Sequence, residues 1–280
     1  MLNESELKAV VSEVLAGLGY RVEGPIPPAE TKADEPRVTG TNWQNPEAMK
    51  EMLTTTPARI GIGRAGARYD TEAWLKFRMD HAAARDAIFH EIGDEFVEKL
   101  GAVPVTTMTR DRHEYLLRPD LGRRLDEASV ALLREKCVGS ARVQIVVVDG
   151  LSGIAVERNA MDFIRAFSDG LKLNGIAGAG TMGTPIFVRK GRVAIMDHIG
   201  ETLKPELIVE LVGERPGLVT DESMSAYFCY GPNLKAIESD RTLISNIHRG
   251  GIPPVEAGAH AANLAAKILA AKVSGVKLGL

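Results

Sequence analysis

The chain has 280 residues, 45% of them hydrophobic, and its 34 basic and 37 acidic side chains give a formal net charge of −3. A chain of this size can bury a substantial core, so we expect a globular, cytoplasmic protein with more than one structural unit. The balanced charge creates no basic field for phosphates, and no apolar run approaches the roughly 20 residues that span a bilayer. We therefore expect neither nucleic acid nor a membrane as a partner.

Residues 1–40 form the first predicted unit. Apolar side chains recur at helical spacing within residues 2–18, and residues 21–40 are rich in proline and charge. This pattern predicts an amphipathic helix on an extended linker, without the basic region and apolar core of a secretion signal. So short a helix is marginal alone and must dock, either on the body of this chain or on a neighbour.

Residues 41–103 are predicted to form a small helical domain. Asp70 or Thr71 can cap a helix, and one face of that helix carries an apolar stripe that needs a partner surface. Its members are Trp74, Phe77, His81, Ala84 and Ile88. We interpret His81 as a hydrogen-bonded core histidine, because a lone histidine gives neither metal-ligand spacing nor a catalytic partner.

Residues 104–280 alternate strand and helix patterns, which predicts a Rossmann-like domain with a mostly parallel sheet. Two short apolar runs around Lys190 and Gly191 are interpreted as a hairpin. The predicted strands are 143–148, 186–188, 193–195, 207–212 and 226–230, and the predicted helices are 120–136, 159–173 and 255–273, the last closed by Gly275.

Several short motifs partly match known binding or catalytic signatures. Residues 61–66 (GIGRAG) and 178–183 (GAGTMG) fit GxGxxG, but the first follows no buried strand and the second precedes a strand instead of a helix. A nucleotide-dependent oxidoreductase is therefore only an alternative function. Residues 150–154 (GLSGI) lack the last glycine of a nucleophile elbow, and the six histidines contain no HxxxH pair. Cys137 and Cys229 lack CxxC spacing. We therefore predict neither catalytic residues nor metal ligands.

The most specific signal lies near the C-terminus. Residues 211–218 (LVGERPGL) are an apolar strand end followed by a carboxylate, an arginine and a Pro-Gly turn, and residues 240–257 (DRTLISNIHRGGIPPVEA) are a polar loop that leads into a helix. Both resemble the small (light) subunit of adenosylcobalamin-dependent ethanolamine ammonia-lyase. The resemblance covers nearly everything from about residue 57 onward and includes residues 63–66, 118–125, 148–152 and 183–193.

The resemblance implies a division of labour between two subunits. In that family a TIM-barrel large subunit carries the substrate site, and adenosylcobalamin is held where the subunits meet, within a higher oligomer of heterodimers. A radical released from the cofactor abstracts hydrogen from ethanolamine, which yields acetaldehyde and ammonia. This chain has no room for an additional barrel of about 250 residues, so its implied role is to cover and orient the cofactor.

The resemblance also implies the site residues. The family's cobalamin contacts correspond to Val193, Glu214 and Leu243, and Glu214 can accept hydrogen bonds from amides or hydroxyls of the cofactor. Some relatives have cysteine where Leu243 stands. The alternative for Glu214 is an ion pair with Arg215 or a neighbour, and Asp149 is a further candidate because it also ends a strand.

Two more features bear on the cofactor and on location. Residues 111–116 (DRHEYL) have the acid and histidine of a D-x-H-x-x-G cobalamin motif but lack its glycine. This agrees with a family that leaves the cofactor's own base on cobalt. The helix at 2–18 resembles those that recruit enzymes to bacterial microcompartments, so residues 1–18 are a candidate shell-binding segment. A non-catalytic shell adaptor is the second alternative function.

Overall fold

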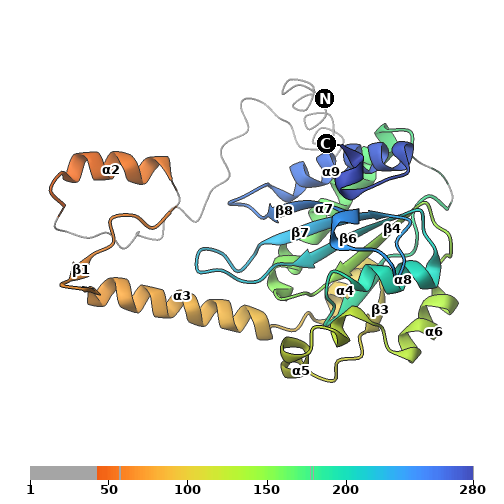
Figure 1. Cartoon of the computed structure of the whole chain (residues 1–280), viewed down its shortest axis with the longest axis horizontal. Coiled ribbons are helices and arrows are strands. Elements are labelled where there is room, and N and C mark those ends of the chain that lie inside the picture. Colours follow the sequence, from red (N-terminus) through yellow and green to blue (C-terminus); the bar gives the residue numbers. More distant parts are fainter. Residues whose placement is uncertain (1–42, 57, 177, 179, 280) are drawn as a thin grey trace.

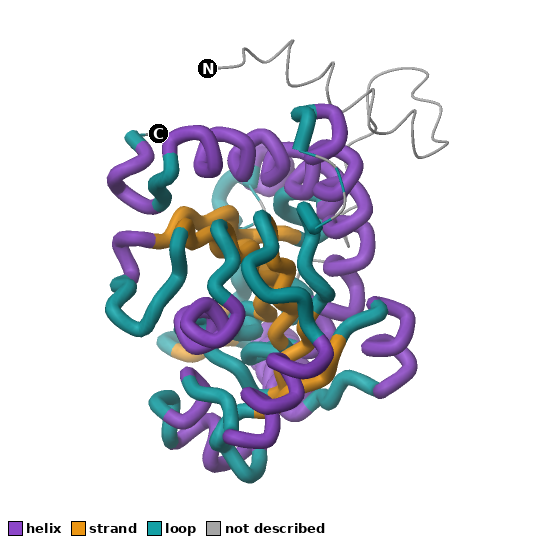
Figure 2. Tube along the Cα trace, turned by 90° about the vertical axis from the view of Figure 1, so that its right-hand side faces the viewer, coloured by secondary structure: helices purple, strands orange, loops and turns teal. Residues whose placement is uncertain are grey.

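The computed structural model describes residues 43–56, 58–176, 178 and 180–279. The predicted N-terminal helix and its proline-rich linker lie outside this range. Within it, a mixed sheet lies between two layers of helices, and a long helix extends away from one side (Figure 1; Figure 2). No helix in the described part of the chain is long and apolar enough to cross a membrane.

The central sheet has six strands in the order β3-β5-β4-β6-β7-β8. The first four in this order are parallel, and β7 and β8 continue the sheet as antiparallel strands. The predicted α/β fold with a mostly parallel sheet is therefore confirmed. The strands are β3 (Val103–Thr106), β4 (Val143–Val148), β5 (Ile186–Arg189), β6 (Leu207–Gly213), β7 (Met224–Tyr230) and β8 (Arg241–Ile247).

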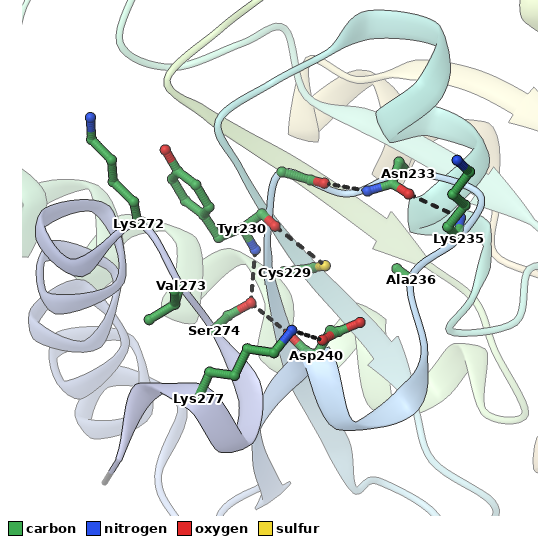
Figure 3. A pocket seen from close by; sticks show the side chains of 11 residues that line it. Cys229, Tyr230, Asn233, Lys235, Ala236, Asp240, Lys272, Val273, Ser274 and Lys277 are labelled. Atoms are coloured by element: carbon green, nitrogen blue, oxygen red, sulfur yellow. Dashed lines mark hydrogen bonds and ion pairs between the residues drawn. The ribbon is translucent and has the colours of Figure 1, made fainter.

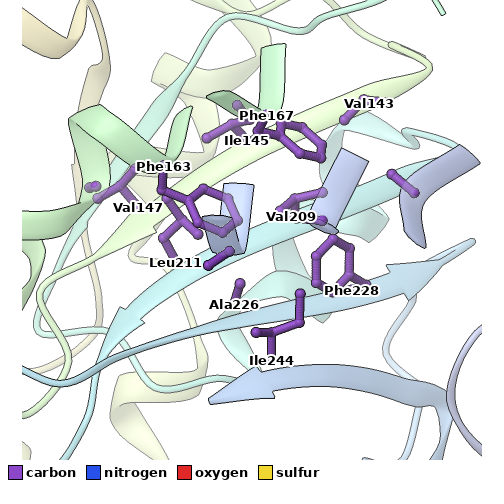
Figure 4. Packing of buried hydrophobic residues seen from close by; sticks show 14 of the residues in the cluster. Val143, Ile145, Val147, Phe163, Phe167, Val209, Leu211, Ala226, Phe228 and Ile244 are labelled. Carbon is purple, nitrogen blue, oxygen red and sulfur yellow. The ribbon is translucent and has the colours of Figure 1, made fainter. Parts of the chain in front are cut away.

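One face of the sheet is covered by α4 (Asp94–Leu100), α7 (Gly153–Leu173) and α9 (Pro254–Ala271). Figure 4 shows Phe163 and Phe167 of α7 against aliphatic side chains of the central strands. Strands β4 and β6 are buried along their whole length because helices cover both of their faces. This explains their nearly continuous apolar sequences.

The opposite face is covered by α6 (Glu127–Lys136) and α8 (Ile195–Leu203), and we call it the α8 face. Leu133 of α6 and Ile199 of α8 are fully buried against β4, β5 and β6. Over β7 and β8 this face is more open, since Tyr227 is only half-buried and Leu243 is 46% exposed. The α8 face therefore has a closed half and an open half.

Several predicted elements need correction. The hairpin is wrong: β5 lies between β3 and β4 and pairs with both in parallel, and Ile195 begins α8. Two short apolar runs around a Lys-Gly pair look locally like a hairpin, but pairing with distant strands decides the outcome. The predicted polar loop after Asp240 contains strand β8. The left-handed C-cap of α9 is Lys272 instead of Gly275.

Two predicted helices also have different limits. Helix α6 begins only at Glu127, where the Asp126 carboxylate accepts a hydrogen bond from the amide of Ser129. A 3-10 turn, η1 (Leu121–Arg123), precedes it. Helix α7 begins earlier than predicted, at Gly153, with Ser152 as its N-cap. Three other short helical elements lie after β3, namely α5 (Arg112–Leu117), η2 (Glu238–Asp240) and η3 (Gly275–Leu278).

The segment before the sheet contains α2 (Pro46–Thr55), the strand pair β1 (Arg64–Ala65) and β2 (Arg68–Tyr69), and α3 (Thr71–Phe89). Asp70 caps α3, as predicted, by accepting a hydrogen bond from the amide of Ala73. The prediction of a core histidine is wrong, because His81 is exposed. Helix α4 belongs to the main core, and the domain boundary at residue 103 stays a prediction.

Candidate functional site

The three residues singled out in the sequence lie on the α8 face. Val193 comes just before α8 and packs against the core on that side. Glu214 follows β6 directly, and strand alternation places it on the same side as Ile208 and Val212. Leu243 lies on β8 opposite Tyr227, which also packs on this side. The fold thus brings these residues to one side of the sheet, although Val193 and Leu243 are 50 residues apart in the sequence.

The Glu214 carboxylate is held by three hydrogen-bond donors. The Ser223 hydroxyl donates to Oε2 at 2.6 Å, and the Ser225 hydroxyl donates to Oε1 at 2.6 Å. The amide of Asn246 donates to Oε1 at 2.9 Å. Partial burial raises the pKa of Glu214, but these hydrogen bonds outweigh burial, so its pKa lies below the ordinary value. Glu214 is therefore a fixed, charged acceptor at neutral pH.

A bulge in β8 supplies the third donor. The register between β7 and β8 shifts near the end of the pair, and Asn246 adopts a left-handed backbone with φ of 62°. Asparagine tolerates this conformation better than most residues. The bulge directs the Asn246 amide toward Glu214.

The alternative role of Glu214 is an ion pair with Arg215 or a neighbour. Among the described residues, Glu214 forms no ion pair with Arg215, and its carboxylate is held by hydrogen bonds instead.

A buried charged cluster, which the sequence analysis missed, lies beside this site. Asp197 of α8 and Arg241 of β8 form an ion pair with Oδ2 and Nη2 2.5 Å apart, and their side chains are only 10% and 4% exposed. Burial raises the pKa of Asp197 to about 6 although Arg241 opposes this. The pair links α8 directly to the edge strand of the sheet.

Glu210 completes the cluster from the middle of β6. It is fully buried, and neither carboxylate oxygen meets a partner in hydrogen-bond geometry within the described residues. Burial raises its pKa well above the ordinary value, with Arg241 and the nearby Met196 backbone offsetting only part of the effect. One signal was present in the sequence, because Glu210 is the single charged residue in an otherwise apolar strand.

Asp149 lies at a different place, at the carboxyl ends of β4 and β5. Its Oδ2 is 3.3 Å from Nη1 of Arg112, and its Oδ1 accepts the amide of Gly191 at 3.3 Å. A cavity of about 490 Å³ opens here, and its lining includes Arg189 and Lys190. The chain leaves β4 toward α7 and leaves β5 toward α8, which makes this the switch point where open α/β sheets bind ligands. Acidic and basic side chains balance within the cavity, so its charge does not select a ligand.

A second cavity of about 280 Å³ lies near the opposite ends of the strands (Figure 3). Its central hydroxyl, Ser274 Oγ, accepts the amide of Tyr230 and donates to the carbonyl of Asp240. Burial raises the pKa of Cys229 to about 11, so this thiol stays protonated at neutral pH. These groups are engaged in tying β7 to the turn after α9, which is a structural role.

The motifs considered for other chemistries have ordinary structural positions. Gly61 and Gly66 lie in turns with positive φ, ahead of α3, and β5 follows Gly183. Asp111 is the N-cap of α5, and His113 packs its ring against Phe89. Among the described residues, no three His, Cys, Asp or Glu side chains gather as a metal site.

Comparison with known proteins decides the family. The family described as ethanolamine ammonia-lyase light chain matches residues 46–279. The chain belongs to this family. An ethanolamine ammonia-lyase small subunit from Clostridium perfringens is 48% identical over 232 residues, which cover 83% of this chain and 77% of the relative. A small subunit from Fusobacterium nucleatum is 40% identical over 299 aligned positions that cover 100% of both chains.

Proposed function

We propose that this light chain acts as the small subunit of an ethanolamine ammonia-lyase and holds adenosylcobalamin between its α8 face and a large subunit. The observation that carries the proposal is the Glu214 carboxylate, fixed by three donors beside the open half of the α8 face. Ethanolamine ammonia-lyase is a carbon–nitrogen lyase, and the names of the relatives support this activity for the assembled enzyme.

The residues present fit such a cofactor. A carboxylate offers about four acceptor positions, and Glu214 uses three of them, so Oε2 retains one for an amide or hydroxyl of the ligand. Leu243 adds exposed apolar surface and Val193 adds a half-buried side chain, both suited to the flat body of a corrin. Adenosylcobalamin, when bound, supplies the radical chemistry that removes the amino group of ethanolamine.

The chain's own part in the reaction is to bind and orient. Glu214 accepts a hydrogen bond and fixes one edge of the ligand, while Val193 and Leu243 exclude water from its apolar surface. The substrate groups are assigned to the large subunit, a TIM-barrel protein in this proposal. We further propose, from the sequence of residues 1–18 alone, that the enzyme is recruited to a bacterial microcompartment, as an oligomer of such heterodimers.

A reconstitution experiment tests the proposal. The isolated chain should bind adenosylcobalamin weakly and release no ammonia from ethanolamine, because it provides only one wall of the site. Ammonia release should appear when the large subunit is added. Turnover by the isolated chain, or full turnover by a large subunit that lacks it, would contradict the proposed division of labour.

A further inference from the structure

Helix α3 has an unusual distribution of side chains. Its 19 residues bury only three alanines, Ala73, Ala84 and Ala87. The large apolar side chains of its first half are exposed in two pairs on different sides of the helix, Trp74 with Phe77 and Leu75 with Met79, and we call the surface of both pairs together the α3 face. This face consists of Trp74 (47% exposed), Leu75 (56%), Phe77 (36%) and Met79 (66%). A helix that packs only on its own protein would show the reverse arrangement.

The α3 face has the composition of an interface. Trp74 and Phe77 stack with ring centroids 5.7 Å apart, and the guanidinium of Arg78 lies 5.9 Å from the Trp74 ring. Aromatic residues, methionine and arginine are enriched where proteins bind each other. Single exposed apolar residues are common on protein surfaces, but four large ones within six residues of one helix indicate a binding surface.

The surroundings of α3 indicate which partner covers it. Arg59 pairs with Asp80 of α3 at 2.7 Å and also donates to the backbone carbonyl of Leu218. Leu218 and Val219 are exposed apolar residues of the β6–β7 loop, which begins at Glu214. Figure 1 shows α3 and this loop extending on the same side of the molecule. Arg59 thus bridges α3 to the loop that begins at Glu214, and both α3 and this loop carry exposed apolar residues.

We propose that the large subunit binds the α3 face together with Leu218 and Val219. This inference rests on the proposed function, because a partner that covers a ligand at Glu214 must approach the β6–β7 loop. Nineteen helical residues extend about 28 Å, which is long enough to follow the surface of a neighbouring subunit. The stacked aromatic pair would be the energetic centre of the contact.

The test measures binding of the large subunit to the full chain by calorimetry, with and without adenosylcobalamin. The double variant Trp74→Ala/Phe77→Ala should bind at least about tenfold more weakly under both conditions, with an unchanged unfolding midpoint. Leu75→Ala should also weaken binding. Leu173→Ala is its matched control, because Leu173 has the same exposed fraction, 56%, but lies at the end of α7. It should have no effect.

The outcomes separate this inference from the proposed function. Weaker assembly by the α3 variants without cofactor supports the inference even if the complex fails to bind cobalamin. Unchanged affinity for the large subunit overturns it. Two further results would also overturn the inference, because each would identify a different occupant of the α3 face. Loss of self-association by the double variant would indicate a second copy of this chain. In a Trp43→Phe background, a red shift of Trp74 emission on deleting residues 1–42 would indicate the N-terminal segment.

Discussion

Glu210 lies within β6 and Glu214 directly follows that strand, on the same side and four residues later, yet the two carboxyl groups have opposite environments. Glu210 is enclosed without a hydrogen-bond donor in good geometry, and burial raises its pKa well above the ordinary value. Glu214 is partly buried, but three donors keep its pKa below the ordinary value. The number of hydrogen-bond donors, more than the extent of burial, decides which carboxyl group has the lower pKa. Under the proposed function Glu214 is therefore the charged acceptor for a ligand, whereas burial favours the protonated form of Glu210.

The largest expected effect comes from breaking the ion pair beside Glu210. Arg241→Met leaves the Asp197 carboxylate buried without its partner, and this should lower the free energy of unfolding by about 3–5 kcal/mol at pH 8. Urea unfolding measures the loss. It should shrink at pH 5, below the pKa of about 6, because Asp197 is then mostly protonated.

The control is Arg118→Met, which breaks an exposed pair with Asp120 in which both side chains are 58% exposed. This change should lower the free energy of unfolding far less than Arg241→Met does, because solvent screens the pair. Equal losses for the two variants would show that burial of Asp197 and Arg241 does not make their pair special.

Glu214→Gln should test the charged member of the comparison. The change keeps one acceptor oxygen, and the serine hydroxyls can turn to donate or accept, so the fold should persist. A hydrogen bond to a charged group contributes about 1.5–3 kcal/mol, so the affinity of the complex for cobalamin should fall roughly 10- to 100-fold. Cobalamin absorbance titration measures this, and the KM for ethanolamine should barely change at saturating cofactor.

Arg215→Met is the matched control, because Arg215 is exposed and is not among the hydrogen-bond donors to Glu214. It should leave cofactor affinity unchanged. If Glu214→Gln lowered the unfolding midpoint while cobalamin affinity stayed intact, Glu214 would be a structural residue and the proposed contact would be wrong.

A smaller effect should appear in the pH dependence of stability. Because the pKa of Glu210 is raised in the folded state, the unfolded chain binds fewer protons above the ordinary carboxyl pKa, and the free energy of unfolding falls as pH rises. Glu210→Gln should remove this dependence, so it should stabilise the protein more at pH 8 than at pH 4. Glu214, with its lowered pKa, contributes stability at neutral pH that is lost as pH falls. Identical pH profiles of stability for wild type, Glu210→Gln and Glu214→Gln would contradict the assigned environments.

The smallest effect is expected from deleting residues 1–40. Neither glutamate depends on that segment for the contacts described above, so cofactor affinity and turnover should stay nearly unchanged. Solubility or location in the cell should change, which fractionation or fluorescence microscopy can measure. If the truncated chain no longer assembled with the large subunit, the segment would be part of the interface instead of a docking tag.

The sequence predicted those parts of the fold that depend on local patterns. The apolar runs of β4 and β6 and the Asp70 cap of α3 were found because propensity and burial agree there. Strand β8 was missed because its bulge interrupts the alternation of buried and exposed residues. The false hairpin arose because the parallel partners of β5 lie far away in the sequence.

The candidate site was predicted only as single residues. Family resemblance pointed to Glu214, but its donors Ser225 and Asn246 lie 11 and 32 residues further along the chain. Sheet pairing and a bulge bring them together, and neither can be inferred from spacing. The Asp197–Arg241 pair was missed for the same reason, because 44 residues separate its members.

That pair also has a mechanical consequence. Asp197 lies four residues after Val193, and Arg241 lies two residues before Leu243, so the buried ion pair acts as a strut between these two segments. A shift of either segment would have to break or carry along this buried ion pair. If both residues contact the ligand, their contributions to its affinity should then be coupled instead of additive.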